Sequence, residues 1–232
     1  MSNTSADNND NGNNATTTVL RLTKIEEFYS DGMLDQTITF LYDEQNRLAK
    51  LTNTDNDGST NVTLYNYINN RLTSTEWMRS GTTTVTDFTY ENDLIILATL
   101  NEPNYTSTNE YSYNSLNQLI SKKQFDRGVF CCEDTFTYNA QVNISSTSSS
   151  SDTSVNFFDY DNKKNIGLIL FDSSYLKIAE IGNNNIIKSY SDSSSQIVTY
   201  TYEYNDDNYP TISKIFVDGV FIRELKYTYT DL

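Results

Sequence analysis

Any acid–base chemistry in this chain would proceed without histidine, because its 232 residues include none. Histidine is the commonest general base and a common transition-metal ligand. Paired carboxylates can hydrolyse glycosidic bonds without it. Neighbouring carboxylates face apart in a strand and are solvated in a turn, however, and no serine-elbow or phosphate-loop motif is present. The sequence predicts that the protein is not an enzyme. The neighbouring acidic pairs are Glu26–Glu27, Glu133–Asp134 and Asp206–Asp207.

One segment has the spacing of calcium ligands. Asn53, Asp55 and Asp57 alternate ahead of Gly58, like the first half of an EF-hand loop. Leu64 occupies the place of the closing glutamate. The favoured alternative is a hairpin turn with Asp-Gly at its tip, which explains every residue. Calcium is therefore the one cofactor considered, and the main expectation is that there is none.

Aromatic side chains are the candidate binding residues. The single tryptophan, Trp77, would make a ligand-stacking platform, or would belong to the core or cover a sheet edge. We add Tyr65, Tyr111 and Tyr202, because each opens a copy of the repeated motif described next.

An aromatic-x-Tyr motif recurs about every 23 residues, and such a period indicates stacked copies of one supersecondary unit. The interval between Tyr160 and Tyr204 is twice the usual one, and we place a degenerate ninth copy there, at Ala179-Glu180-Ile181. The eight clear copies are Phe40-Leu41-Tyr42, Tyr65-Asn66-Tyr67, Phe88-Thr89-Tyr90, Tyr111-Ser112-Tyr113, Phe136-Thr137-Tyr138, Phe158-Asp159-Tyr160, Tyr202-Glu203-Tyr204 and Tyr227-Thr228-Tyr229.

The alternation of aromatic and polar residues within each copy is that of a half-buried strand. Ile38, Phe40 and Tyr42 would share one face, with Thr39 and Leu41 on the other. So many inward tyrosines predict that the hydroxyls reach a rim, a wet interior or one another, since a dry core would leave them unpaired. An Asx-rich turn follows each motif, and an aliphatic residue then opens the return strand. These residues are Leu48, Leu72, Leu94, Leu119, Ile144, Ile166, Ile186 and Ile212.

Glycines mark the far ends of the hairpins. Asp31-Gly32, Asp57-Gly58 and Asp218-Gly219 predict type I′ turns. The fold class is therefore all-β: a long antiparallel meander of about nine hairpin repeats and 17 or 18 strands. A sheet of this size curls, so we expect one curled sheet, an open barrel or a spiral, with the aromatic face inward.

Composition limits domains, partners and location. Residues 1–18 are polar and predict a disordered tether, and residues 19–232 predict a single hairpin-repeat domain. The net charge of −15 argues against nucleic-acid binding. No transmembrane segment is expected. A polar tether ahead of a β domain is what a trimmed secretion signal leaves, which predicts a secreted or outer-membrane, cell-surface lipoprotein with a lipid anchor in its precursor.

The adjacent Cys131 and Cys132 have two interpretations. They are two free thiols of a strand, or a vicinal disulfide in a turn beside Gly128.

The repeats resemble the YD repeat of RHS-type proteins, which reads Tyr-Asp-x-x-Gly-Arg-Leu after aromatic-x-Tyr. Residues 42–48 and 113–119 carry the resemblance, with Asn46 and Asn117 where glycine is usual; Asn165 is placed similarly. Residues of about 38 to 232 are covered. The chain also resembles short, uncharacterised YD-repeat surface lipoproteins of Gram-negative bacteria. Large RHS proteins wind such strands into a shell around a toxin, and nine units are too few for that. The repeat brings no catalytic residues.

Three functions remain. The first is a non-enzymatic surface domain that binds a glycan or a protein partner. The second is a purely structural envelope spacer, which predicts no concave pocket. The third is a histidine-free carboxylate hydrolase, which needs two carboxylates about 5–10 Å apart in a cleft. The ligand and the oligomeric state have no signal in the sequence.

Overall fold

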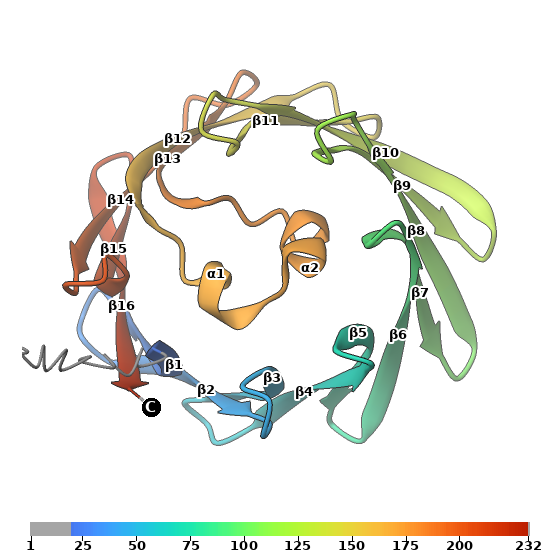
Figure 1. Cartoon of the computed structure of the whole chain (residues 1–232). Coiled ribbons are helices and arrows are strands. Elements are labelled where there is room, and N and C mark those ends of the chain that lie inside the picture. Colours follow the sequence, from blue (N-terminus) through green and yellow to red (C-terminus); the bar gives the residue numbers. More distant parts are fainter. Residues whose placement is uncertain (1–19, 232) are drawn as a thin grey trace, which may run out of the picture.

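The computed structural model describes residues 20–231, and the expected tether of residues 1–18 lies outside them. Sixteen antiparallel strands close into one barrel, in which each strand pairs with its neighbours in sequence (Figure 1). The strands are β1 (Leu20–Tyr29), β2 (Leu34–Tyr42), β3 (Leu48–Asp55), β4 (Thr60–Ile68), β5 (Arg71–Arg79), β6 (Thr82–Glu91), β7 (Leu94–Glu102), β8 (Tyr105–Tyr113), β9 (Leu119–Asp126), β10 (Val129–Tyr138), β11 (Ile144–Ser149), β12 (Val155–Lys164), β13 (Asn184–Ser191), β14 (Ile197–Tyr204), β15 (Pro210–Val217) and β16 (Val220–Asp231).

The first and last strands pair with each other. Leu22 lies opposite Tyr229, and Ile25 lies opposite Tyr227. This pairing removes both exposed edges of the sheet. The predicted all-β antiparallel meander in one curled sheet is confirmed. Over the described residues the sheet closes into a barrel instead of staying open or forming a spiral, and it has 16 strands instead of the expected 17 or 18.

The long interval in the repeat is an insertion and not a ninth copy. Between β12 and β13 the chain forms two short helices, α1 (Gly167–Leu170) and α2 (Ser173–Ile178), which lie inside the ring of strands (Figure 1). Ala179-Glu180-Ile181 follows α2 and is not a strand, and Ile166 precedes α1 rather than opening a return strand. Asp172 caps α2 by accepting bonds from the amides of Ser174 and Tyr175.

We call residues 165–183 the plug. Within the described residues, neither helix is long or apolar enough to cross a membrane. Leu170 of the plug is buried in a cluster with Leu22 and Phe40 from the wall. A second cluster joins Ile95, Leu119 and Phe136. The aromatic face of the strands therefore points into the barrel, as predicted.

The other face of the wall points outward, away from the lumen. Leu41, between inward Phe40 and Tyr42, is 58% exposed, and Thr39 and Thr137 are also exposed. The predicted facing of these alternate residues is confirmed.

Most motif tyrosines bond to the backbone of the preceding repeat, although Tyr204 bonds the Asp161 carboxylate instead. The ladder between β3 and β4 ends at Lys50 opposite Leu64, and beyond it the hydroxyl of Tyr67 donates to the carbonyl of Leu48 at 2.9 Å. For seven tyrosines the expectation that the hydroxyls reach a rim, a wet interior or one another is wrong, because each of these hydroxyls closes a ladder that ends early. The donor–acceptor pairs, 2.6–2.9 Å long, are Tyr42–Leu22, Tyr67–Leu48, Tyr90–Leu72, Tyr113–Ile95, Tyr138–Leu119, Tyr202–Ile186 and Tyr229–Pro210.

Loss of one such bond should be measurable. Tyr113→Phe leaves the carbonyl of Ile95, a fully buried residue, without its 2.6 Å donor. We expect the free energy of unfolding to fall by about 1–3 kcal/mol in urea titrations. Tyr190→Phe is the control, because Tyr190 is 37% exposed on the outer face; it should change stability by less than about 0.5 kcal/mol. Equal losses would show that the hydroxyl bond of Tyr113 has no special weight.

The turns follow the predicted chemistry only in part. Asn46 and Asn117 have φ of 67° and 58°, as expected for residues in place of glycine, whereas Asn165 does not have positive φ. Asp218-Gly219 has positive φ at both residues, as a type I′ turn requires. Asp31 and Asp57 do not have positive φ, so the prediction of type I′ turns there is wrong. The Asp31 carboxylate instead accepts from Met33 in a longer loop.

Candidate functional site in the barrel lumen

The plug occupies the end of the lumen at which the Asx turns lie. The Ser174 hydroxyl donates to the carbonyl of Asp93 in the β6–β7 turn at 2.5 Å. On the wall, the Lys122 ammonium bonds Glu180 of the plug at 2.7 Å and Asp134 at 3.1 Å. Burial lowers the pKa of Lys122, but the bonds to the two carboxylates outweigh it and leave the pKa above its ordinary value.

Tyr175 is the centre of the contact between plug and wall. Its ring lies 5.7 Å from Phe88 and 6.3 Å from Tyr65, both in edge-on geometry, and 4.9 Å from Phe171 of the plug. Such aromatic pairs add to the gain from burial. The plug is thus held by an aromatic cluster and by the ion pair of Glu180.

A large cavity lies between the plug and the wall formed by β13–β16, β2 and β3. Its volume is about 420 Å³, within the range of small-molecule sites. We call it the chamber. It is not sealed, and its lining is mainly aliphatic and aromatic. Prominent lining residues are Ile38, Phe40, Leu51, Ile166, Tyr200, Tyr202 and Tyr227.

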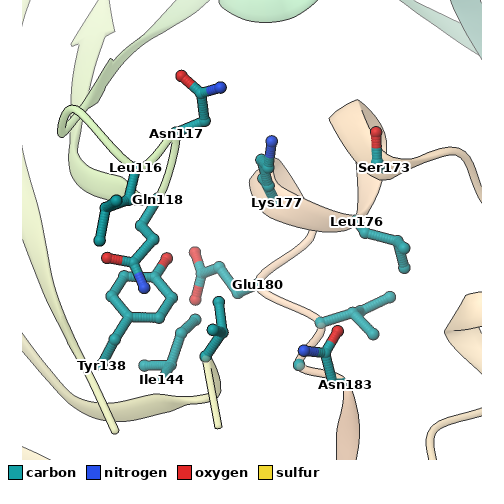
Figure 2. Close-up of a pocket in the computed structure, with 13 residues that line it drawn as sticks. Leu116, Asn117, Gln118, Tyr138, Ile144, Ser173, Leu176, Lys177, Glu180 and Asn183 are labelled. Atoms are coloured by element: carbon teal, nitrogen blue, oxygen red, sulfur yellow. The ribbon is translucent and has the colours of Figure 1, made fainter. Parts of the chain in front are cut away.

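A smaller cavity of about 170 Å³ lies at the plugged end, between α2 and the β8–β9 turn (Figure 2). Gln118 and Tyr138 line it from the wall, and Lys177 and Glu180 line it from the plug. Burial lowers the pKa of Lys177. The volume is below that of most ligand sites, and Glu180 is already paired with Lys122. This cavity therefore suits at most a very small molecule.

The opposite end of the lumen has a polar inner wall. Thr75 lines a cavity with inward Tyr111 and Tyr175, so Trp77, two residues along the same strand, also faces inward. Thr84 lies opposite Trp77, and the Thr84 hydroxyl donates to the Glu102 carboxylate at 3.0 Å. Tyr105 pairs with Glu102.

We call this part of the inner wall the mouth. Trp77 is 39% exposed although it points into the barrel, and Glu102 and Arg79 are exposed as well. Inward side chains can be exposed only where solvent enters the lumen. Strand β6 separates Trp77 from Glu102, so their backbones lie about 10 Å apart. The residue between them, Thr84, is small. The mouth comprises Asn61, Trp77, Arg79, Thr84, Glu102 and Tyr105.

The other predicted binding residues are not part of the mouth. Tyr65 and Tyr111 are each 8% exposed and belong to the two core clusters. Tyr202 lines the chamber, stacks on Tyr204 at 5.8 Å and donates its hydroxyl to Ile186. The four predicted aromatic residues are therefore spread around the lumen and do not form one site.

The predicted calcium ligands lie in and before the β3–β4 turn. Asn53 donates to Gln36 at 2.6 Å on the inner face. The Asp57 carboxylate accepts from the amide of Ser59 at 2.8 Å, and Asp55 accepts from the Ser59 hydroxyl at 3.0 Å. The turn thus uses the oxygens of Asp55 and Asp57 itself, whereas the buried Oδ1 of Asn53 accepts no hydrogen bond among the described residues. Across residues 20–231, no group of three histidine, cysteine or acidic side chains is placed to hold a metal ion. Calcium stays the less favoured alternative to the hairpin turn.

Neither cysteine forms a disulfide. Both lie in β10 and not in the turn, and Cys131 is the extra residue of a bulge between Phe130 and Cys132. The structure agrees with the interpretation as two thiols.

Two charged clusters inside the barrel are not indicated by the sequence. Arg223 bonds both Glu27 and Asp35, and the bond to Glu27 is the main reason that the pKa of Arg223 is raised. Lys122 bonds Asp134 and Glu180. Their members come from distant repeats, so only strand register and the position of the plug could reveal them.

Buried phenols predict loss of stability at high pH. Burial raises the pKa of Tyr42, Tyr67, Tyr111, Tyr138 and Tyr160 to about 12, against about 10 in an unfolded chain. A phenol with a raised pKa ionises more readily when unfolded, so this stability is complete below pH 10 and is lost as the pH rises through about 12. Ultraviolet titration should show these tyrosines ionising together with unfolding. Ionisation near pH 10 with the fold intact would contradict the burial.

Comparisons with known proteins support the architecture. No family model and no curated protein matches the sequence. A porin-like protein from Bacteroides uniformis superposes on 90% of this chain and 98% of its own, with a TM-score of 0.62 and 20% identity. A porin-like protein from Bacteroides vulgatus covers the same shares, with a TM-score of 0.40 and 11% identity. The first similarity shows a shared fold, and the second is too distant to add to it.

Proposed function

We propose that this protein is a non-enzymatic β-barrel of the cell surface that binds a neutral glycan at the mouth of its lumen. The observation that carries the proposal is the orientation of Trp77, which points inward yet is solvent-exposed. Thr84 lies opposite Trp77 on the next strand, and Thr84 bonds Glu102 on the strand after that. An indole face stacks on the apolar face of a sugar ring, and a carboxylate accepts bonds from its hydroxyls. Asn61 and Arg79 supply donors beside them.

A glycan fits this site better than a folded protein does. The aromatic residues that the sequence offered as a binding surface lie on the inside of a closed barrel. A narrow, flexible ligand can enter such a space, whereas a folded domain cannot reach its wall. The net charge of −15 disfavours an acidic glycan, which leaves neutral sugars.

The inward carboxylates favour binding over catalysis. Glu27 and Asp35 share Arg223, and Asp134 and Glu180 share Lys122. In each pair a cation stands between the two carboxylates, in the space that a glycosidase leaves for the sugar and water. These arrangements support a structural role for both pairs.

The outer wall supports a barrel that stands in water. Barrels that face lipid carry apolar residues outward and polar residues inward. Here cross-strand charged pairs lie on the outer face at mid-strand, Lys214–Glu224 at 3.5 Å and Lys123 opposite Glu133, while the aromatic residues of the repeated motif fill the inside. With the polar tether and the resemblance to YD-repeat surface lipoproteins, this polarity favours anchoring at the cell surface over insertion in the bilayer. The porin-like neighbour supports the same compartment.

The proposal is tested on a glycan array with three proteins. Trp77→Ala removes the stacking platform and should lower the affinity for the best neutral ligand by about 30-fold or more, as expected for a central aromatic residue. Met78→Ala is the matched control, because Met78 is the next residue and faces outward, opposite Val62. It should bind like the wild type. A wild-type protein that binds no glycan, or one that Trp77→Ala leaves unchanged, would refute the proposal.

The spacer hypothesis has less support. It predicts no concave pocket, but the chamber and the mouth are both open to a ligand. It remains the interpretation to adopt if the array stays blank.

A further inference from the structure

We infer that the chamber is a second binding site, for a small neutral apolar molecule. It is separate from the mouth: it lies between the plug and the wall of β13–β16, β2 and β3, whereas Trp77 belongs to β5. Figure 1 shows β5 across the ring from β13–β15. The inference does not depend on glycan binding.

The lining decides the polarity of the ligand. No charged side chain lines the chamber, so an ion entering it would lose its hydration without gaining a partner. Ile38, Phe40 and Leu51 present apolar surface, and removing such surface from water drives binding. A neutral molecule with an apolar body fits this environment.

The polar groups of the chamber are already paired, with one exception. Tyr202 donates to the carbonyl of Ile186 at 2.8 Å, and the Tyr227 hydroxyl lies 3.0 Å from that of Ser213. Asn185 bonds Asp161 and the carbonyl of Lys164. Among the described residues, the Tyr200 hydroxyl has no such partner, although the ring lines the chamber. A ligand with a single hydrogen-bonding group would satisfy it.

The size of the chamber suits a molecule of two or three fused or linked rings or of comparable bulk, since sites of about 300–1,000 Å³ hold small organic ligands. Its volume is about 420 Å³. N-phenyl-1-naphthylamine is a suitable probe: it is neutral and apolar, has one N–H group, and fluoresces strongly only away from water. Its sulfonated analogue, 8-anilinonaphthalene-1-sulfonate, adds a negative charge to the same skeleton. It should bind weakly, because no cationic side chain lines the chamber.

The experiment measures the Kd of both probes on the full chain. The wild type should bind the neutral probe at least tenfold more tightly than the anionic one. Leu51→Trp fills the chamber from β3 and should weaken the neutral probe at least tenfold. Thr52→Trp is the matched control, because Thr52 faces outward, opposite exposed Thr39. It should leave binding unchanged.

Tyr200→Phe keeps the volume of the chamber and removes only the free hydroxyl. This variant tests the inference if Leu51→Trp fails to fold. It should weaken the neutral probe about fivefold, the effect of one ordinary hydrogen bond. The inference is overturned if the wild type does not bind the neutral probe, or if both tryptophan variants bind it like the wild type. The second result would place the probe on the outer wall, where Phe216 and Phe221 lie 5.6 Å apart.

Discussion

Phe136→Ala should lower the free energy of unfolding by about 3–5 kcal/mol, the usual cost of truncating a core phenylalanine. The Phe136 ring points into the barrel, is only 5% exposed and packs with Ile95, Leu119 and Ile144. In a closed barrel of fixed strand number, neighbouring strands cannot move inward freely to fill the space left behind. Chemical denaturation followed by circular dichroism gives the difference.

The neighbouring residue provides the control. Thr137 points outward and is exposed, and its hydroxyl lies near those of Ser145 and Ser146 at the surface. Thr137→Ala should change stability by no more than about 0.5 kcal/mol. Comparable losses from the two substitutions would mean that the wall does not have an inner and an outer face as described.

Tyr175→Ala should release the plug. The Tyr175 ring joins Tyr65 and Phe88 of the wall to Phe171 of the plug, and its loss removes contacts worth about 3–5 kcal/mol. Because these contacts hold the plug and not the strand ladder, backbone amides of residues 165–183 should exchange with deuterium far faster than in the wild type. Amides of the wall strands should keep most of their protection.

A second plug residue, Leu168, shows whether the change in exchange comes from lost contact between plug and wall or from any truncation in the plug. Leu168 in α1 is 37% exposed, so Leu168→Ala should leave exchange in the plug nearly unchanged. If Tyr175→Ala accelerates exchange equally in wall and plug, the plug is part of the folding core. If it changes neither, the aromatic cluster does not hold the plug.

The fold was predictable where it depends on local pattern. Period-two alternation gave the inward facing of Phe40 and the outward facing of Leu41, and the spacing of motifs gave the meander. Closure was not predictable, because pairing of Leu22 with Tyr229 depends on shear accumulated over all the strands. The plug is hard to predict because doubled spacing also fits a weak copy of the repeat. The signal was present in the apolar run ending at Phe171, followed by Asp172 and two serines, a helix N-cap pattern.

The candidate site was predictable to a lesser extent. The sequence identified Trp77, and alternation along the strand places it on the inner face. Glu102 could not be associated with it, because that requires the registers of β5 with β6 and of β6 with β7. The role of the motif tyrosines also depends on three-dimensional structure, since Tyr67 bonds Leu48 only where the ladder between their strands ends.

The arginines of the motif show how one repeat supports the next. The guanidinium of Arg47 lies 4.3 Å from the ring centre of Tyr67, and that of Arg71 lies 4.6 Å from the ring centre of Tyr90. Each arginine thus covers the tyrosine that bonds the backbone of its own repeat. The interactions link successive hairpins around the barrel, which gives a physical reason for the spacing of the motif.

Fluorescence of Trp77, the only tryptophan in the chain, tests most directly whether the mouth of the lumen is the binding surface. The wild-type protein is titrated with the neutral oligosaccharide that binds it most tightly on the array, and emission and acrylamide quenching are recorded together. Stacking of a sugar on the exposed indole should shift the emission to shorter wavelength and reduce quenching, with the same Kd as calorimetry gives. Binding by calorimetry with unchanged emission and quenching would place the ligand elsewhere and contradict the account.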